Sequence, residues 1–600
     1  MVRRRRTYLR LAAVGLVSLF ASALPSACAL DVYGTYDPDA PCTIGASAPC
    51  YTGPQGTAGV GACKPGTQVC RIDRTFGPCL DEVVPQNEDC FTPDDEDCDG
   101  KDRDDDECLC APGDTLPCET GQLGACASGV RTCTSDGFSF GPCLPASSPV
   151  PEDCATEADD DCDGVAPGCT GTTELGVSRG GLLSDVSFAV ATDGVVHATA
   201  GVIDGDVAFR TVNLGSLYVD RRLSNLGPTW SLEVPAVGGR AAARGVAVAP
   251  GSGDVIAAGE FQGLMDFKNG NMITSAANGV DPFVVAVSAA GAVRWARAFG
   301  DAEAQVANAV AAGPNGWIAV AGDASGVLDF GGGPRATNGA DLFVAILDAD
   351  GGHIWSRVFG DAAPQTAYGV AFTKSGDVVV AGEFDGTLDL GGGVLQSAGG
   401  GDAFVARLSG VDTTSKWSVK IGDDALVQRA YAVAVGPSGE VAVTGTFDGS
   451  ITLAGTTLTS TTPVDAFLLV FEPDGALRFG KQIGDTTGGN QIGTGVAFDA
   501  AGNVVVTGTF DGSIDFGAGA VASAGTFDVF VAKYAAETGA LLWARTEGDD
   551  QPQHAFGIAA LPDSRTLLSG GFAGTIDFDA PAAPLTSQGV LDVFVARLAP

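Results

Sequence analysis

Basic residues and histidine are both scarce in this 600-residue sequence, and each shortage argues against a class of function. The chain has 33 lysines and arginines against 73 acidic residues, which gives a formal net charge of −40. Because nucleic-acid binding needs a basic face, we expect no nucleic-acid partner. The three histidines, His197, His353 and His554, are scattered, and no motif of a Ser/His/Asp or Cys/His catalytic set accompanies them. A binding or structural role is therefore favoured over catalysis.

Cysteine is absent after Cys169, and the 17 cysteines up to that point follow a pattern. Sixteen of them form two runs of eight with nearly the same spacing. The first run is Cys42, Cys50, Cys63, Cys70, Cys79, Cys90, Cys98 and Cys108, and the second is Cys110, Cys118, Cys126, Cys133, Cys143, Cys154, Cys162 and Cys169. The runs also share Phe-Gly-Pro-Cys and Asp-Cys-Asp-Gly motifs, so they are an internal duplication. We predict two disulfide-bonded modules, at residues 30–109 and 110–169, in an exported protein.

Long apolar runs are also absent, apart from Leu11–Leu24 near the N-terminus. This run follows several arginines and has the length of a signal-peptide core, which is shorter than the roughly 20 apolar residues of a membrane span. We therefore expect residues 1–29 to be a signal peptide. Leu24–Cys28 resembles a bacterial lipobox, and cleavage before Cys28 would leave a lipoprotein anchored to the outer membrane. Ala27-Cys28-Ala29 instead offers a small-x-small cleavage site, which would remove Cys28 and give a secreted protein.

Each module ends in alternating carboxylates followed by glycine, as in a calcium loop of the EF-hand type. In the first module, positions 1, 3, 5, 6, 7 and 12 of such a loop are Asp95, Asp97, Asp99, Gly100, Lys101 and Asp106. Lys101 would offer its backbone carbonyl. The second module supplies Asp159, Asp161, Asp163 and Gly164 but has Thr170 at position 12, which makes it the weaker site. Calcium is the predicted cofactor, and the alternative is a solvated acidic turn held by disulfides.

Zinc is a poorer candidate for these modules, since they contain no histidine and no Cys-x-x-Cys pair. The modules, with their Asp-Cys-Asp-Gly ends, resemble metal-binding repeats of large secreted myxobacterial proteins. A similar motif occurs in a copper-binding surface protein of methanotrophs, although the lack of histidine here speaks against copper. The resemblance covers about Cys42–Cys169 and implies an exported metal-binding region.

A different repeat, of about 60 residues, fills the chain after the cysteines end. Its clearest marker is Asp-x-Phe, which begins at Asp281, Asp341, Asp402, Asp465, Asp528 and Asp592, with spacings of 60, 61, 63, 63 and 64 residues. An aromatic residue follows in most copies, at Trp295, Trp355, Trp417, Phe479 and Trp543. Four short strands per copy at a fixed period indicate an all-β fold, a β-propeller over residues 185–600.

The number of copies predicts seven blades, or six. A divergent first copy runs from about Val186 to Val234, and a strand in the linker at residues 170–184, near Thr172–Arg179, could close the last blade. The markers resemble the bacterial β-propeller repeat family, which implies the fold but not a function.

Five glutamines recur at one place in the repeat, before the first strand of a copy. They are Gln305, Gln365, Gln428, Gln491 and Gln553, and each follows a Gly-Asp pair by a few residues. A ring of such side chains could line the channel and bind a cation or a glycan. The alternative, which we favour, is that they tie neighbouring blades together by hydrogen bonds.

Together these features predict an exported cell-surface protein with a binding or structural role. Its propeller would bind an extracellular glycan or protein, and a membrane would be contacted only through a lipid anchor. Two other functions are open: an extracellular polysaccharide hydrolase or lyase on a propeller scaffold, and a metal-scavenging surface protein that works through the acidic modules.

Overall fold

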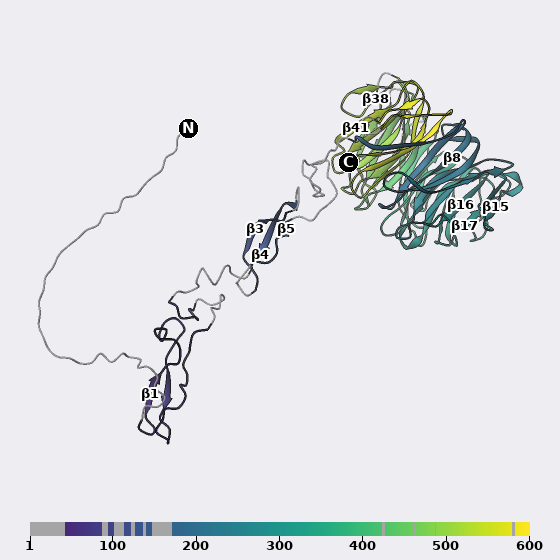
Figure 1. Ribbon diagram of the computed structural model, residues 1–600. Helices are drawn as coiled ribbons and strands as arrows, with labels where there is room; N and C mark the ends of the chain where they lie inside the picture. Colours follow the sequence, from purple (N-terminus) through teal and green to yellow (C-terminus); the bar gives the residue numbers. More distant parts are fainter. Residues whose placement is uncertain are drawn as a thin grey trace, which may run out of the picture. The chain divides into compact units, whose positions relative to one another are not determined.

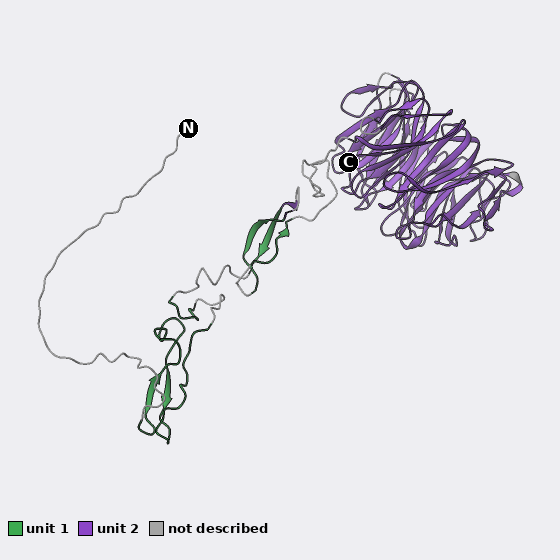
Figure 2. Cartoon of the chain, viewed as in Figure 1, with its two compact units in different colours: residues 1–120, 128–146 green, residues 121–127, 147–600 purple. Residues whose placement is uncertain are grey.

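The computed structural model describes residues 42–86, 94–100, 113–121, 126–135, 140–146, 171–422, 426–460, 463–485, 488–578 and 583–600 (Figure 1). The chain divides into two compact units (Figure 2). The first comprises residues 1–120 and 128–146, and the second comprises residues 121–127 and 147–600. Among the described residues only strands and two short 3-10 turns, η2 (Ala276–Asn278) and η3 (Pro314–Gly316), are found, which confirms the all-β prediction. None of these segments is a helix long and apolar enough to span a membrane.

The first unit contains small sheets, each accompanied by disulfides. Strand β1 (Ser47–Cys50) pairs with β2 (Gly66–Val69), and β3 (Thr115–Glu119) pairs with β4 (Ser128–Thr132), which pairs with β5 (Leu144–Pro145). The disulfides are Cys42–Cys70, Cys50–Cys79, Cys63–Cys98 and Cys118–Cys143. Cys118–Cys143 occupies the same place in the second run of cysteines as Cys50–Cys79 does in the first. The predicted disulfide bonds are therefore confirmed for these pairs.

The second unit is a β-propeller built from four-stranded antiparallel sheets, seven of which are described. Their strands, from the innermost outward, are β7 (Ser184–Thr192), β8 (His197–Ala208), β9 (Thr211–Arg222) and β10 (Pro228–Val234); β12 (Ala241–Val248), β13 (Val255–Phe261), β16 (Asp281–Val287) and β17 (Val293–Ala298); β18 (Gln305–Ala312), β19 (Ile318–Ala324), β22 (Asp341–Leu347) and β23 (His353–Phe359); β24 (Gln365–Phe372), β25 (Val378–Phe384), β28 (Asp402–Leu408) and β29 (Ser415–Ile421); β30 (Gln428–Val435), β31 (Val441–Phe447), β34 (Asp465–Phe471) and β35 (Leu477–Ile483); β36 (Gln491–Phe498), β37 (Val504–Phe510), β40 (Asp528–Tyr534) and β41 (Leu541–Glu547); and β42 (Gln553–Ala560), β43 (Thr566–Phe572), β46 (Asp592–Leu598) and β6 (Thr173–Arg179).

Strand β6 comes from the N-terminal end of the propeller and completes the sheet that contains the C-terminal strand. It pairs antiparallel with β46, with Ser178 opposite Phe594. The innermost strands of the seven sheets neighbour one another in cyclic order, and β42 lies beside β7. The first and last sheets are therefore adjacent.

Short hairpins extend the connections between the second and third strands of most sheets. The paired segments are β14 (Leu264–Asp266) with β15 (Met272–Thr274) and with β11 (Ala236–Val237), β20 (Val327–Leu328) with β21 (Arg335–Ala336), β26 (Thr387–Asp389) with β27 (Val394–Gln396), β32 (Ser450–Leu453) with β33 (Thr456–Thr459), β38 (Ser513–Asp515) with β39 (Ala520–Ala522), and β44 (Thr575–Ile576) with β45 (Leu585–Thr586). The first sheet differs, because its second and third strands, β8 and β9, are 12 residues long and form one continuous hairpin.

The repeat markers of the sequence form the packing between neighbouring sheets. The phenylalanine of each Asp-x-Phe marker is completely buried, at Phe283, Phe343, Phe404, Phe467, Phe530 and Phe594. The indole Nε1 of Trp355 donates a hydrogen bond to Gly410 O at 2.8 Å, in a turn of the next sheet. Trp230, Trp295 and Trp417 donate in the same way. In four copies a tryptophan thus joins two sheets, which explains why it recurs there with the period of the fold.

Candidate functional site

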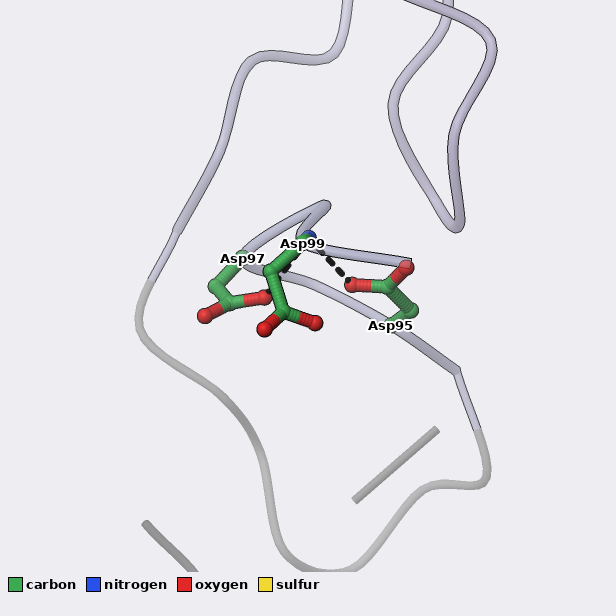
Figure 3. Close-up of side chains that lie close together, drawn as sticks. All are labelled: Asp95, Asp97 and Asp99. Atoms are coloured by element: carbon green, nitrogen blue, oxygen red, sulfur yellow. Dashed lines mark hydrogen bonds between the residues drawn. The ribbon is translucent and has the colours of Figure 1, made fainter. Parts of the chain in front are cut away.

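Three carboxylates of the predicted calcium loop lie together in the first unit (Figure 3). One oxygen from each of Asp95, Asp97 and Asp99 lies within 4.8 Å of the others. Asp95 is buried, and its two oxygens accept hydrogen bonds from the backbone N–H groups of Asp99 at 3.1 Å and Gly100 at 2.9 Å. Asp97 Oδ1 also accepts from Asp99 N at 3.0 Å. These bonds fold the loop so that the carboxylates converge.

The backbone around these carboxylates is fixed by a disulfide and by two left-handed residues. Cys98 is joined to Cys63 and has φ of 63°, and Gly100 has φ of 90°. The turn between Asp97 and Gly100 needs the freedom of glycine in this region. Because a carboxylate oxygen has more than one acceptor direction, each group can accept a backbone N–H and still offer an oxygen to a hard cation.

The remaining predicted metal ligands and the lipidation residue lie outside the described residues. They are Lys101 and Asp106 of the first loop, Asp159, Asp161 and Asp163 of the second loop, and Cys28.

The five glutamines each open an innermost strand, and all are completely buried. Each Nε2 donates to a backbone carbonyl just beyond the second strand of its own sheet: Gln305 to Ser325, Gln365 to Asp385, Gln428 to Asp448, Gln491 to Ser513 and Gln553 to Ala573, at 2.6–3.2 Å. Gln305, Gln365 and Gln553 also donate to the aspartate of the preceding loop. Among the described residues that line the channel, none is one of these glutamines. These bonds agree with the alternative in which the glutamines are structural hydrogen-bond donors. They differ from it in one respect, because they hold each loop to its own sheet and do not tie neighbouring blades together.

The channel wall consists of three layers, each with one residue from every innermost strand. The layers enclose a cavity of about 160 Å³. One layer is aliphatic: Val190, Val246, Val310, Val370, Val433, Val496 and Ile558. The middle layer is small: Ala189, Gly245, Ala309, Gly369, Ala432, Gly495 and Gly557. A Cβ on Gly245 would lie 2.8 Å from Val310 N, so close approach of the strands requires small residues there.

The third layer differs from sheet to sheet, and we call it the variable ring. It consists of Phe188, Arg244, Asn308, Tyr368, Tyr431, Thr494 and Phe556. Each member is the extra residue of a β-bulge in its innermost strand, because the register with the second strand shifts at that position. Bulges turn a side chain away from the regular alternation and occur often beside functional sites. The same β-bulge, repeated in every sheet, therefore turns seven side chains toward the channel.

The second strands supply acidic partners for three members of the variable ring. Arg244 Nη2 lies 2.6 Å from Glu260 Oε1, Asn308 Nδ2 donates to Asp323 Oδ1 at 2.9 Å, and Tyr368 OH donates to Glu383 Oε1 at 2.8 Å. Arg429, in the strand next to Tyr368, pairs with Glu383. Burial raises the pKa of Asp323 to about 6. Charged and hydrogen-bonded groups thus border the ring beside these three members, at one mouth of the channel.

The tip of the long β8–β9 hairpin lies at this mouth, in a cavity of about 430 Å³. Its two turn residues are Phe209 and Arg210. Phe209 has φ of 53°, which is unusual for a bulky residue, and its ring lies 5.4 Å from that of Phe556. The Arg210 guanidinium lies over the Tyr431 ring, 5.9 Å from its centroid, and Arg244 donates a hydrogen bond to Arg210 O. Burial and the nearby Arg244 lower the pKa of Arg210 to about 10.

His554 packs beside the variable ring rather than in a catalytic arrangement. Its ring lies 5.3 Å from that of Phe527 and 5.9 Å from that of Phe209. Its Nδ1 is 3.2 Å from the Thr509 hydroxyl. Burial lowers the pKa of His554 to about 4, so the imidazole is neutral near pH 7.

The sequence contained a signal for the variable ring. The position three residues after each repeated glutamine changes from copy to copy, while the aliphatic residue two positions further on is nearly constant. Within an otherwise uniform repeat, a varying position indicates a side chain that is not required for folding.

No known protein family and no curated protein matches this sequence. Solved structures similar to the chain include Sqt1 from Chaetomium thermophilum, at 13% identity and a TM-score of 0.36, covering 72% of this chain and 99% of that one. The WD40 domain of Pan2 from Neurospora crassa matches at 8% identity and a TM-score of 0.36, over 69% of this chain and 89% of that one. Quinohemoprotein alcohol dehydrogenase from Comamonas testosteroni matches at 11% identity and a TM-score of 0.33, over 69% and 76%. Similarity at this level carries no argument about function.

Proposed function

We propose that this chain is an exported binding protein: a seven-bladed β-propeller, closed by β6, that holds a ligand at the variable ring. The observation that carries the proposal is the ring itself. Seven sheets share one frame of aliphatic, small and aromatic residues, yet the bulged position holds phenylalanine, arginine, asparagine, tyrosine or threonine. Packing alone would favour the same residue in every sheet, as it does in the aliphatic layer, so the variation favours recognition of a ligand without sevenfold symmetry.

The composition of the ring supports binding rather than catalysis. Aromatic rings and a few placed polar groups are typical of ligand sites. Two of the three carboxylates at the mouth, Asp323 and Glu383, each accept a hydrogen bond from a ring residue. A hydrolase or lyase that used these positions would need one of these carboxylates to exchange a proton with substrate in addition to accepting its hydrogen bond. The enzymatic alternative is tested directly, because release of product from any extracellular polysaccharide would establish it.

Binding can be tested by screening the full-length chain against extracellular glycans and cell-wall fragments. Tyr431→Ala should weaken the binding of any compound that the native chain retains, because it removes a ring side chain from the mouth. Val394→Ala is a matched control, since Val394 is an exposed apolar residue in the β26–β27 hairpin, away from the channel. Equal weakening by both variants, or by neither, would contradict the proposal.

We further propose that the Asp95 loop binds calcium. The supporting observation is the convergence of three carboxylates on a backbone that the Cys63–Cys98 disulfide fixes. Calorimetric titration with calcium should show binding that Asp97→Asn weakens by about tenfold or more, because affinity follows the number of charged ligands. Asp81→Asn, an exposed carboxylate of the same module, should leave the affinity unchanged. A preference for a transition metal over calcium would favour the metal-scavenging alternative.

Export, with or without a lipid anchor, remains part of the proposal. The mass of the mature N-terminus tests it: a diacylglyceryl group on Cys28 indicates an anchored lipoprotein, and a start after Cys28 indicates secretion. An intact N-terminus on protein recovered from the native cell would contradict export.

A further inference from the structure

Arg210 differs from the other arginines at the mouth of the channel in its charge environment. Arg244 pairs with Glu260, and Arg429 pairs with Glu383. Over the part of the chain that the structure describes, no carboxylate forms an ion pair with Arg210. The third acidic group at the mouth, Asp323, accepts its hydrogen bond from Asn308 instead.

The groups that contact Arg210 are aromatic and cationic, while Asp323 and Glu383, which line the same cavity, accept hydrogen bonds from other residues. Its guanidinium lies over the neutral ring of Tyr431, and the cationic Arg244 lies close to it. The cation–π contact with Tyr431 offsets part of the loss of hydration, by about 0.5–2 kcal/mol in general. It leaves most of the donors of the planar guanidinium without an anionic acceptor, although the chain carries 73 acidic residues.

The position of Arg210 is built by the fold rather than left to a flexible side chain. It sits in a two-residue turn at the end of 12-residue strands, where the other sheets carry only short hairpins. Arg244 holds the turn by donating to Arg210 O, and Phe209 packs against Phe556 and His554. A half-buried cation held in this way, without an internal counter-ion, is costly unless a ligand supplies the negative charge.

We propose that Arg210 binds a carboxylate group of a small ligand, or of a chain end, that enters the mouth of the channel. The inference rests on the proposed ligand-binding function and names the chemistry of its ligand. A carboxylate fits the planar guanidinium through two parallel hydrogen bonds. The mouth cavity of about 430 Å³ has room for one sugar or amino-acid residue beside the carboxylate. Tyr368 and Tyr431, whose ring centroids are 5.2 Å apart, supply the apolar surface next to it.

Two sources of the carboxylate can be distinguished with matched probes. Titration calorimetry on the full-length chain would compare glucuronate with glucose, and acetyl-alanine with its C-terminal amide. At least one acid should bind, and its neutral partner should bind far more weakly. Binding of glucuronate points to an acidic sugar, and binding of acetyl-alanine points to the C-terminus of a polypeptide.

Variants then assign the acid to Arg210. Arg210→Gln should weaken binding roughly 10- to 100-fold, which is the usual effect of losing hydrogen bonds to a charged group. Arg335→Gln is the control, because it removes an exposed arginine from the β20–β21 hairpin, and it should leave the affinity unchanged. Unchanged thermal melting of Arg210→Gln would show that the fold is intact.

The outcomes separate this inference from the proposed function. If acid and neutral probes bind equally, or if Arg210→Gln keeps full affinity, the carboxylate inference is wrong. The proposed function then still stands if Tyr431→Ala weakens binding. If neither acid binds the native chain, the inference fails, and the glycan and cell-wall screen decides the proposed function independently.

Discussion

Replacing Gly382 by alanine should destabilise the propeller, because this glycine lies opposite the bulge that presents Tyr368. Gly382 is in β25 and pairs with Ala367 of β24, immediately before the bulged residue. A Cβ at this position would lie 1.9 Å from Thr366 O and 2.9 Å from a carbon of the Phe404 ring. Corresponding glycines face the bulges of the other sheets at 1.8–2.0 Å, for example Gly322 and Gly508. The bulge and the glycine are therefore one structural unit.

The expected loss of stability depends on which atoms must move to make room for the new Cβ. Overpacking a core usually costs about 1–3 kcal/mol. Here the atom in the way is a backbone carbonyl in a hydrogen-bonded strand, so we expect the upper end, about 3 kcal/mol. Unfolding entropy near 2.1 cal/mol/K per residue gives about 0.9 kcal/mol/K for the roughly 430 residues of the propeller. The melting temperature should therefore fall by about 3 °C.

The control for Gly382→Ala is Gly176→Ala in the same propeller. A Cβ on Gly176, in strand β6, would make ordinary contacts, the nearest at 3.4 Å from the Phe578 ring. This variant should be neutral, or more stable by about 0.4–1 kcal/mol, since alanine restricts the unfolded chain. Scanning calorimetry of both variants measures the difference. If Gly382→Ala melts no lower than Gly176→Ala, the explanation of the repeated glycine as the partner of the bulge is wrong.

Three further predictions concern the core. Lys533→Met should cost about 3–5 kcal/mol in urea unfolding, because it leaves Asp499, 2.8 Å away and equally buried, without its cation; a cost below about 1 kcal/mol would contradict this. Trp355→Phe should cost about 1 kcal/mol by the same assay, because the hydrogen bond to Gly410 O is lost, and no loss would show that the bond adds nothing. Burial raises the pKa of Asp281 from 3.8 to about 6, so the folded state holds this proton more tightly than the unfolded chain, and stability falls as pH rises through that interval. Asp281→Asn should therefore gain about 2–3 kcal/mol relative to the native chain between pH 4 and pH 7, and a constant difference across that range would refute the shift.

The propeller could be predicted from the sequence because its markers are set by contacts that most of the sheets repeat. Phe343 and the equivalent phenylalanines of the other copies are buried, and Trp355 donates a hydrogen bond to the next sheet. Residues of these types therefore recur with the period of the fold. The disulfide modules could be predicted equally well, because the spacing of the cysteines itself indicates them. The convergence of Asp95, Asp97 and Asp99 also follows from local spacing, because a short loop with a glycine brings alternate carboxylates to one point.

The variable ring could not be found by the same reasoning. The repeated sequence pattern indicated Gln305 and its equivalents, which recur because each loop needs the same hydrogen bond. Residues that bind a ligand have no such reason to recur, and a β-bulge leaves no fixed residue type in the sequence. Arg210 was still harder to predict from the sequence. Its position depends on how far the β8–β9 hairpin extends over the mouth, which is a property of tertiary structure.

The most direct test of the ligand site is the ¹⁹F NMR spectrum of the full-length chain labelled with fluorotyrosine. The sequence has eight tyrosines, and the variable ring contains Tyr368 and Tyr431. Addition of the acid that binds most tightly should shift the resonances of these two residues, assigned by Tyr→Phe variants, and leave that of Tyr51 in the first unit unchanged. Shifts confined to Tyr51, or no shift at either ring tyrosine while calorimetry shows binding, would place the ligand elsewhere and contradict the account.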